Sequence, residues 1–390
     1  MIVDRAWMSR NVGVDPTAVS IPSSAFHHRA AAAPDASLDD LQREIIDFDS
    51  EGPEGAAFLG FTKATGLSRF VDIPWPKGLA PTPAAEAPAG GNKPLPRADV
   101  LVVTWTVDEG HALSRVLTPG KDSHNDYVPY AHNFAALSKE MSRGSPAVEA
   151  KRLGAFWTTK IGAKEVIVFK SESHLSQDTD KHLPANGQLP NAEFWKQIIG
   201  EAQPKLVLTT GTAGGIGKQF EVGDVVVSPV VRFDSQSWLR KASFASGHYA
   251  SQTAKTTFFS QAGDLFKANA SQLPPDNTRP PKITVVGPTG LSQSIVTTDF
   301  FGFDTSDNHF KLQGLGDASE MGDAVLGMVA QSLGASAPPW LAIRNVSDPE
   351  IAAEGTLKQQ AQEAATIYKA YGRWSSVCSA IVCWAAIAAL

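Results

Sequence analysis

The chain has 390 residues, of which 43% are hydrophobic and 19% are charged, values that are ordinary for a globular protein with a large core. Its formal net charge of -6 argues against a general nucleic-acid-binding role, because contacts with phosphates require a basic surface. The first residues show no basic run followed by an apolar core, and the apolar segment 375–390 is too short to cross a bilayer comfortably. We therefore expect a cytoplasmic protein that stays out of membranes and binds no nucleic acid.

Residues 1–97 have the composition of an appendage rather than that of a packed domain. Residues 35–48 could form one amphipathic helix, and residues 78–96 are rich in Pro, Ala and Gly. We expect an irregular N-terminal arm and linker that wraps its own or a neighbouring subunit, in preference to a separate catalytic domain. Phe70 and Trp75 are candidate anchors for this arm.

An α/β pattern begins at residue 98, and we predict one domain over residues 98–390. Its first part predicts a strand at 99–106, a helix at 107–117, a β-hairpin made of 155–160 and 165–170, and a helix at 189–202. Asp108 and Glu109 lie near the start of the first helix, where the helix dipole favours negative charge. Solvated capping charges are the favoured interpretation of this pair, with a binding role as the alternative.

The stretch 204–231 organises the domain. It predicts two buried strands, one at 206–210 ending in a glycine turn and one at 224–231. Gly211 and Gly214 lack the Cβ atoms that would keep a ligand away from the backbone amides, and Thr212 adds a hydroxyl donor. The turn could therefore cradle a phosphate or a sugar, or it could be a purely structural tight turn.

The last part of the chain predicts strands at 280–287, 295–298 and 340–346, a helix at 321–333, and one or two closing helices over 355–390. Gly372 is the position at which the closing segment could break. Cys378 and Cys383 are interpreted as small core residues rather than as a redox pair, and neither has a partner at zinc-ligand spacing.

Two polar positions after the predicted hairpin have open interpretations. Lys170 could pair with a phosphate or be solvated, and His174 could contact a ligand or serve a structural role. Further on, Asp348 follows the strand at 340–346, where α/β sheets present ligand-binding groups. It could be a general acid or a turn aspartate before Pro349.

Three segments in order resemble the superfamily of nucleoside phosphorylases and nucleosidases. They are TGTAGG followed by VGDVVV at 210–227, IVTTDFFGFD to SEMGDAVLG at 295–327, and WLAIRNVSDP at 340–349. This superfamily includes purine nucleoside and uridine phosphorylases, methylthioadenosine/S-adenosylhomocysteine nucleosidases and AMP nucleosidase. The resemblance implies an α/β fold with a mixed, twisted central sheet flanked by helices.

The resemblance also implies roles for individual residues. Asp348 matches the aspartate that supports protonation of the purine, and Phe301, with Phe300 close behind, matches the phenylalanine that stacks on the base. The first strand leads into the substrate site, so binding candidates there are Thr104, Thr106 and Glu109. Near the ribose or phosphate the candidates are Thr212, Ala213 and Gly214, and His174 is a further candidate.

One position departs from the family pattern. Relatives carry Met-Glu where this chain has Met321 and Gly322, and the glutamate of that pair holds the ribose hydroxyls. Glu320 and Asp323 flank the gap and could each supply a carboxylate, although one residue on a helix is a rotation of about 100°. The sugar contact is therefore expected to differ from that of relatives.

The expected function is cleavage of the N-glycosidic bond of a purine nucleoside or nucleotide. Water is favoured over phosphate as the nucleophile, because Thr209 stands where several phosphorylases carry an arginine. A phosphate-dependent phosphorylase and an inactive nucleoside-binding sensor are the alternatives. No metal or organic cofactor is implied, and the resemblance predicts a homo-oligomer.

Overall fold

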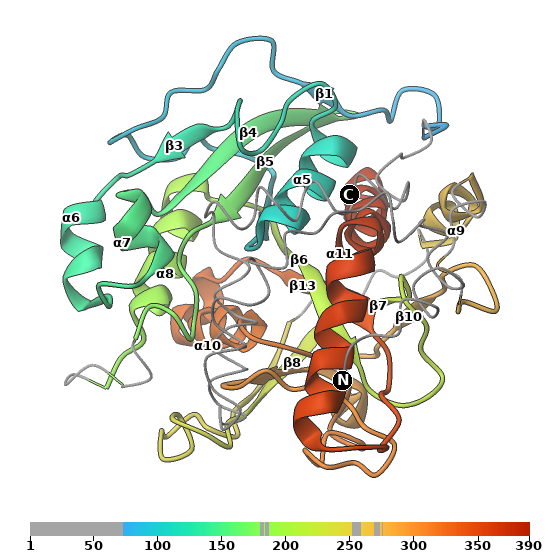
Figure 1. Ribbon diagram of the computed structural model, residues 1–390. Coiled ribbons are helices and arrows are strands. Elements are labelled where there is room, and N and C mark those ends of the chain that lie inside the picture. The colour runs from blue at the N-terminus through green and yellow to red at the C-terminus, as the bar shows by residue number, and fades with distance from the viewer. Residues whose placement is uncertain (1–72, 180–182, 184–186, 252–258, 269–273, 275) are drawn as a thin grey trace, which may run out of the picture.

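A mixed β-sheet forms the centre of the protein (Figure 1). The computed structural model describes residues 73–390 except 180–182, 184–186, 252–258, 269–273 and 275. In the described residues the strands follow the order β1 (Thr82–Pro83), β4 (Gly154–Ile161), β5 (Lys164–Ser171), β2 (Val100–Thr104), β6 (Leu206–Gly215), β12 (Gly316–Glu320), β11 (Ser294–Thr298), β8 (Val230–Asp234) and β9 (His248–Ala250). Four strands join this path from the side: β3 (Val128–Tyr130) on β4, β13 (Trp340–Asp348) on β6 and β7 (Val225–Ser228), and β10 (Ile283–Val285) on β7.

Helices cover both faces of this sheet (Figure 1). One face carries α5 (Val107–Leu117), α9 (Phe259–Ala268) and α11 (Leu357–Ala388), and the other carries α8 (Pro190–Ala202) and α10 (Asp323–Leu333), with the short α6 (Phe134–Leu137) and α7 (Pro146–Ala150) near α8. Short 3-10 turns lie at Ser138–Glu140, Leu291–Gln293 and Gly334–Ser336. The predicted α/β fold is confirmed.

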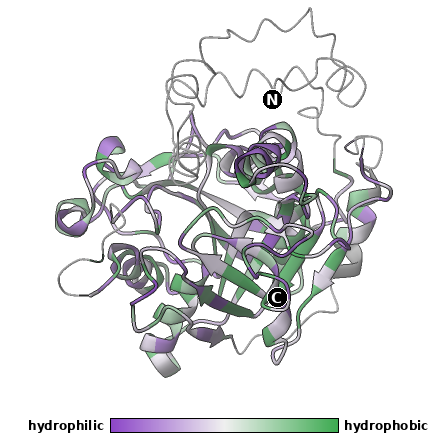
Figure 2. Ribbon diagram, turned by 60° about the horizontal axis from the view of Figure 1, so that its bottom comes forward, coloured by the Kyte–Doolittle hydropathy of each residue, from purple (hydrophilic) through white to green (hydrophobic). Residues whose placement is uncertain are grey.

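Burial on both faces explains the continuous apolar runs of the central strands. In β2, Leu101 and Val103 belong to the core under α8 and α10, whereas Val100 and Val102 belong to the core under α5 and α11. Alternate residues of a strand point to opposite faces, so a strand covered on both sides is apolar at every position. Figure 2 shows this as hydrophobic strands inside helices whose outer surfaces are hydrophilic.

The early elements agree closely with the sequence prediction. The helix at 107–117 is α5, the hairpin is the antiparallel pair β4 and β5, and the helix predicted at 189–202 is α8. Thr106 caps α5 in a capping box with Glu109. The strand predicted at 224–231 is instead two strands, β7 and β8, separated at Pro229, which has no backbone N–H to donate.

Three predicted element boundaries are wrong. The strand β6 does not turn at its first glycine but continues to Gly215, pairing in parallel with β2 and β13. The strand β13 also extends beyond Val346 and includes Asp348, so this aspartate is not in a turn. The helix predicted from residue 321 begins at Asp323.

The closing segment is one helix, and Gly372 does not break it. A Cβ atom at Gly372 would lie 3.0 Å from the ring of Tyr368, so the glycine permits close packing within a buried helix. Cys378 and Cys383 are free and buried on this helix, as predicted. No helix in the described part of the chain is long and apolar enough to cross a membrane.

The described end of the predicted arm packs on the domain. The Trp75 ring lies 4.9 Å from the Trp384 ring, and Trp384 Nε1 donates a 2.7 Å hydrogen bond to the carbonyl of Leu79. Strand β1 pairs with β4. The helix predicted at 35–48 and the anchor Phe70 lie outside the described residues, and the boundary at residue 97 stays a prediction.

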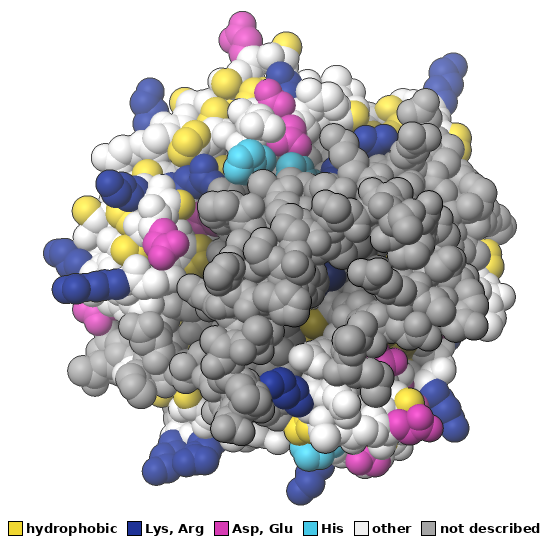
Figure 3. Space-filling model, viewed as in Figure 1, with side chains coloured by type: hydrophobic (Ala, Val, Ile, Leu, Met, Phe, Trp, Pro, Cys, Tyr) yellow, Lys and Arg dark blue, Asp and Glu magenta, His cyan; other side chains and the backbone are white. Residues whose placement is uncertain are grey.

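Charges of both signs are mixed on the surface. On the described part of the face shown in Figure 3, Lys and Arg side chains are interspersed with Asp and Glu. The described part of that face therefore offers no extended basic surface of the kind that binds a phosphate backbone.

Candidate active site

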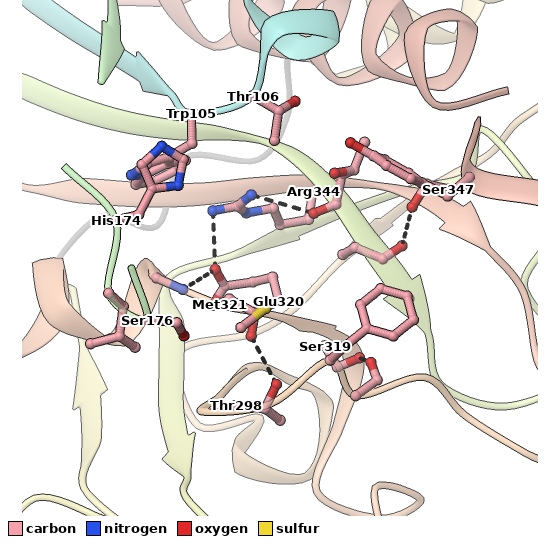
Figure 4. A pocket seen from close by; sticks show the side chains of 18 of the residues that line it. Trp105, Thr106, His174, Ser176, Thr298, Ser319, Glu320, Met321, Arg344 and Ser347 are labelled. Atoms are coloured by element: carbon pink, nitrogen blue, oxygen red, sulfur yellow. Dashed lines mark hydrogen bonds and ion pairs between the residues drawn. The ribbon is translucent and has the colours of Figure 1, made fainter. Parts of the chain in front are cut away.

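A cavity of about 130 Å³ opens where several strands of the sheet end (Figure 4). The parallel strands β2, β6 and β13 run into it with their carboxyl ends, the position at which α/β sheets bind ligands. Its lining comprises Trp105, Thr106, Glu109, His174, Leu175, Ser176, Gln177, Thr212, Ala213, Gly214, Thr298, Phe301, Gly302, Ser319, Glu320, Met321, Gly322, Arg344, Ser347, Asp348 and Tyr368.

The cavity brings together most of the residues proposed from the sequence. Ten of them line it: Thr106, Glu109, His174, Thr212, Ala213, Gly214, Phe301, Glu320, Met321 and Asp348. Three do not. Thr104 is buried and donates to Glu109, Asp323 is bonded to Arg344 behind the wall, and Phe300 packs on Phe310 with ring centroids 5.1 Å apart.

Asp348 is a buried carboxyl at the end of β13. Ser347 Oγ donates a 2.8 Å hydrogen bond to its Oδ1, and its Oδ2 approaches the backbone of Gly214 so closely that a Cβ atom there would lie 3.0 Å away. Burial raises the pKa of Asp348 to about 7, against the smaller lowering effect of the Ser347 hydrogen bond. At neutral pH this group can therefore hold a proton and give it up.

Glu109 is the second carboxylate of the cavity, and the interpretation of it as a solvated capping charge is wrong. Its side chain is 3% exposed and accepts five hydrogen bonds: from Thr104 Oγ1, from the amides of Trp105, Thr106 and Thr212, and from Thr212 Oγ1, at 2.7–3.1 Å. Asp108, the other predicted capping charge, is also buried.

The first glycine of the TGTAGG segment makes room for Glu109. Gly211 has a φ of 151°, and a Cβ atom there would lie 2.4 Å from Glu109 Oε1. The sequence predicted that Thr212 contacts a ligand, but its amide and its hydroxyl both donate hydrogen bonds to this carboxylate. In this structure the glycine-rich segment therefore binds the carboxylate of Glu109.

Arg344 forms a buried ion cluster on one wall of the cavity. Its guanidinium makes two hydrogen bonds to Asp323, at 2.6 and 2.8 Å, and one to Glu320 at 3.1 Å. The ring of Trp105 stacks over it at 4.8 Å, and Figure 4 shows Trp105 and His174 on one side of Arg344 and Ser347 on the other. Arg344 thus pairs with two carboxylates.

Glu320 is held by backbone and side-chain donors at the start of α10. It accepts from the amides of Gly322 and Asp323, from the hydroxyl of Thr297 and from Arg344. Burial and then the Asp323 charge raise its pKa, but Arg344 and these donors favour the ionised form, which we assign.

Two polar side chains from the segment after β5 complete this wall. Burial, and next the charge of Lys170, lower the pKa of His174 to about 3, so the imidazole is neutral at physiological pH. Ser176 Oγ is buried and has no hydrogen-bond partner among the described residues. Lys170 itself is neither solvated nor free for phosphate, because it forms a buried ion pair with Glu172.

The Arg344 cluster gives a stability prediction. Arg344→Met should lower the free energy of unfolding by about 3–5 kcal/mol, since it leaves Asp323 and Glu320 buried without their cation. Lys160→Met is the control, because the Lys160 to Glu165 ion pair is 60% and 50% exposed and should contribute almost nothing. Urea denaturation of both variants tests this, and equal midpoints would contradict a structural role for the cluster.

Residues 127–382, more than half of the chain, match the family described as the phosphorylase superfamily. The chain belongs to the phosphorylase superfamily. Members are enzymes, nucleosidases and phosphorylases, which act on N-glycosidic bonds. The family predicted from the sequence is thus confirmed.

Solved structures of similar fold have low sequence identity to this phosphorylase-superfamily chain. A 5′-methylthioadenosine/S-adenosylhomocysteine nucleosidase from Neisseria meningitidis is 16% identical, with 75% of this chain and 100% of that chain covered and a TM-score of 0.44. A futalosine hydrolase from Helicobacter pylori is 15% identical, with 74% and 96% covered and a TM-score of 0.45. The search among curated proteins found no match.

Several residues that line the cavity were not predicted from the sequence. Trp105 stands between two threonines at a strand end, a pattern that could have marked it as a lining residue. Ser176 lies two residues after His174 and could have been proposed with it. Tyr368 had no local signal, because only the packing of α11 brings it to the cavity.

Proposed function

We propose that the protein cleaves the N-glycosidic bond of a purine nucleoside with water. The observation that carries this proposal is Asp348, a buried carboxyl whose pKa burial raises to about 7, in one cavity with the aromatic ring of Phe301 and the carboxylate of Glu109. An aromatic face suits a flat heterocycle, and a proton-holding carboxyl suits a departing base.

Asp348 supplies the acid in this mechanism. Cleavage leaves negative charge on the departing base, and a purine can take up a proton at N7, in the same five-membered ring as the N9 atom that loses the sugar. A carboxyl that retains its proton near neutral pH can donate it there, and the Ser347 hydroxyl bonded to Oδ1 fixes its orientation.

Glu109 supplies negative charge to the sugar. As the bond breaks, positive charge develops on the sugar ring, and a fixed carboxylate beside it stabilises that charge. Five donors hold Glu109 in place before substrate arrives, so no reorganisation is needed during the reaction. When water adds to the sugar it loses a proton, and this proton balances the one that Asp348 gives to the base.

Phosphate is the less suitable nucleophile for this cavity. Arg344 is the one cationic side chain among the described lining residues, and Asp323 and Glu320 already neutralise it. The amide and hydroxyl of Thr212 are engaged with Glu109. Since Glu109 and Glu320 also line the cavity, a phosphate dianion would meet electrostatic repulsion without a free cation to offset it among the described lining residues.

A panel of purine nucleosides and nucleotides, incubated with and without inorganic phosphate, tests the proposal. Free base and free sugar should appear from uncharged nucleosides at the same rate in both conditions. Base release that requires phosphate would support the phosphorylase alternative instead. Saturable binding without any base release would support a sensor and overturn the proposed activity.

A further inference from the structure

We infer that no carboxylate of the cavity accepts a hydrogen bond from the 2′-hydroxyl of the sugar. The enzyme then cleaves 2′-deoxyribonucleosides nearly as well as ribonucleosides. This inference rests on the proposed nucleosidase function and specifies its substrate class. It follows from the hydrogen bonds of the acidic side chains at the cavity and from the lack of a side chain at Gly322.

Strong selection for a sugar hydroxyl requires a free charged acceptor. A hydrogen bond from a hydroxyl to a carboxylate is worth roughly ten to more than a hundredfold in affinity, whereas one to a neutral hydroxyl is worth about tenfold or less. A carboxylate has about four lone-pair positions, so one that already accepts four or five donors has no room for another.

The two ionised carboxylates that line the described cavity are both occupied. Glu109 accepts five hydrogen bonds, three at Oε2 and two at Oε1. Glu320 accepts five contacts from Thr297, Gly322, Asp323 and Arg344. Neither side chain has a lone pair left for a sugar hydroxyl.

Asp323 and Asp348 do not fill this role either. Both oxygens of Asp323 accept from Arg344, and the side chain lies outside the cavity lining. Asp348 has a carboxyl that holds its proton near neutral pH and serves the base in the proposed mechanism. Among the described lining residues, the polar groups that remain for the sugar are neutral, such as the unpartnered hydroxyl of Ser176.

Gly322 leaves this wall of the cavity without a side chain. A Cβ atom there would make ordinary contacts at 3.7 Å, with Glu320 Oε2 and with the Trp105 ring, so it would not clash. The φ of Gly322 is -170°, outside the left-handed region that favours glycine. The lack of a carboxylate at this position is what we expect to set the selectivity toward the sugar.

The test compares kcat/KM of the wild-type protein for adenosine and 2′-deoxyadenosine, and for guanosine and 2′-deoxyguanosine. We expect the ribonucleoside to be preferred by less than about tenfold in each pair. A larger preference would overturn the inference while leaving the nucleosidase function intact. Failure to release base from all four compounds would instead overturn the proposed function.

Gly322→Glu, with Gly322→Gln as the charge control, tests the role of the open position. The Glu variant should raise the preference for ribonucleosides at least about tenfold above that of the Gln variant, because a free carboxylate then faces the sugar. Equal preferences in two folded variants would contradict the assignment of selectivity to Gly322. If either variant fails to fold, as judged by circular dichroism, the wild-type ratio alone decides.

Discussion

Asp348→Asn should lower kcat for base release by roughly 10²–10⁴-fold, the usual contribution of general acid catalysis. Asparagine has the same shape and can still accept the hydrogen bond from Ser347, but it has no proton to give to the departing base. Steady-state kinetics on a purine nucleoside measure the loss, and a melting curve checks that the fold is retained.

The rate of base release should also depend on pH, in a direction set by the pKa of Asp348. Burial raises the pKa of Asp348 to about 7, so the active, protonated form dominates below pH 7 and is lost as the pH rises above it. Wild-type kcat should therefore be flat below about pH 7 and fall above it, and the residual activity of Asp348→Asn should lack this step.

Asp317 offers a matched control for Asp348. Burial raises the pKa of Asp317 to about 6, against the lowering effect of Lys282, yet this carboxyl does not line the cavity. Asp317→Asn should retain near wild-type kcat and the same pH profile. Full activity in Asp348→Asn, or an equal loss in both variants, would remove Asp348 from the acid role.

Glu109→Gln should reduce both activity and stability. The glutamine side chain keeps one acceptor oxygen, but its NH₂ group faces N–H donors that the carboxylate accepts from in the wild type. The substitution also removes the negative charge that stabilises the sugar cation. We expect kcat/KM to fall by about a hundredfold or more and the free energy of unfolding to fall by about 3 kcal/mol.

Glu165→Gln is the control for Glu109, because Glu165 lies at the surface in an exposed ion pair. Urea denaturation should show a shifted midpoint for Glu109→Gln and almost none for Glu165→Gln, and kinetics should show a loss only for the former. A Glu109→Gln variant with unchanged midpoint would show that the five hydrogen bonds do not stabilise the fold.

Local pattern was sufficient for the elements whose signals lie within one segment. The helix α5 and the β4–β5 hairpin follow from apolar periodicity and turn residues. Similarity to a superfamily grouped Thr212, Phe301 and Asp348, and all three line one cavity.

Contacts between distant segments could not be predicted in the same way. Glu109 and Thr212 are 103 residues apart in the sequence. No local pattern around either residue predicts that the Thr212 amide donates a hydrogen bond to the Glu109 carboxylate. Gly372 is similar, because helix propensity alone favours a break there, whereas α11 continues through it with Tyr371 and Trp374 buried in the core.

The central claim is that water attacks the sugar of a purine nucleoside in this cavity. The most direct measurement is a reaction in heavy-oxygen water, with and without inorganic phosphate, followed by mass spectrometry of the sugar. The account predicts free base together with free sugar that carries one heavy oxygen, in equal yield in both conditions. Sugar phosphate without heavy oxygen, or no base at all, would contradict it.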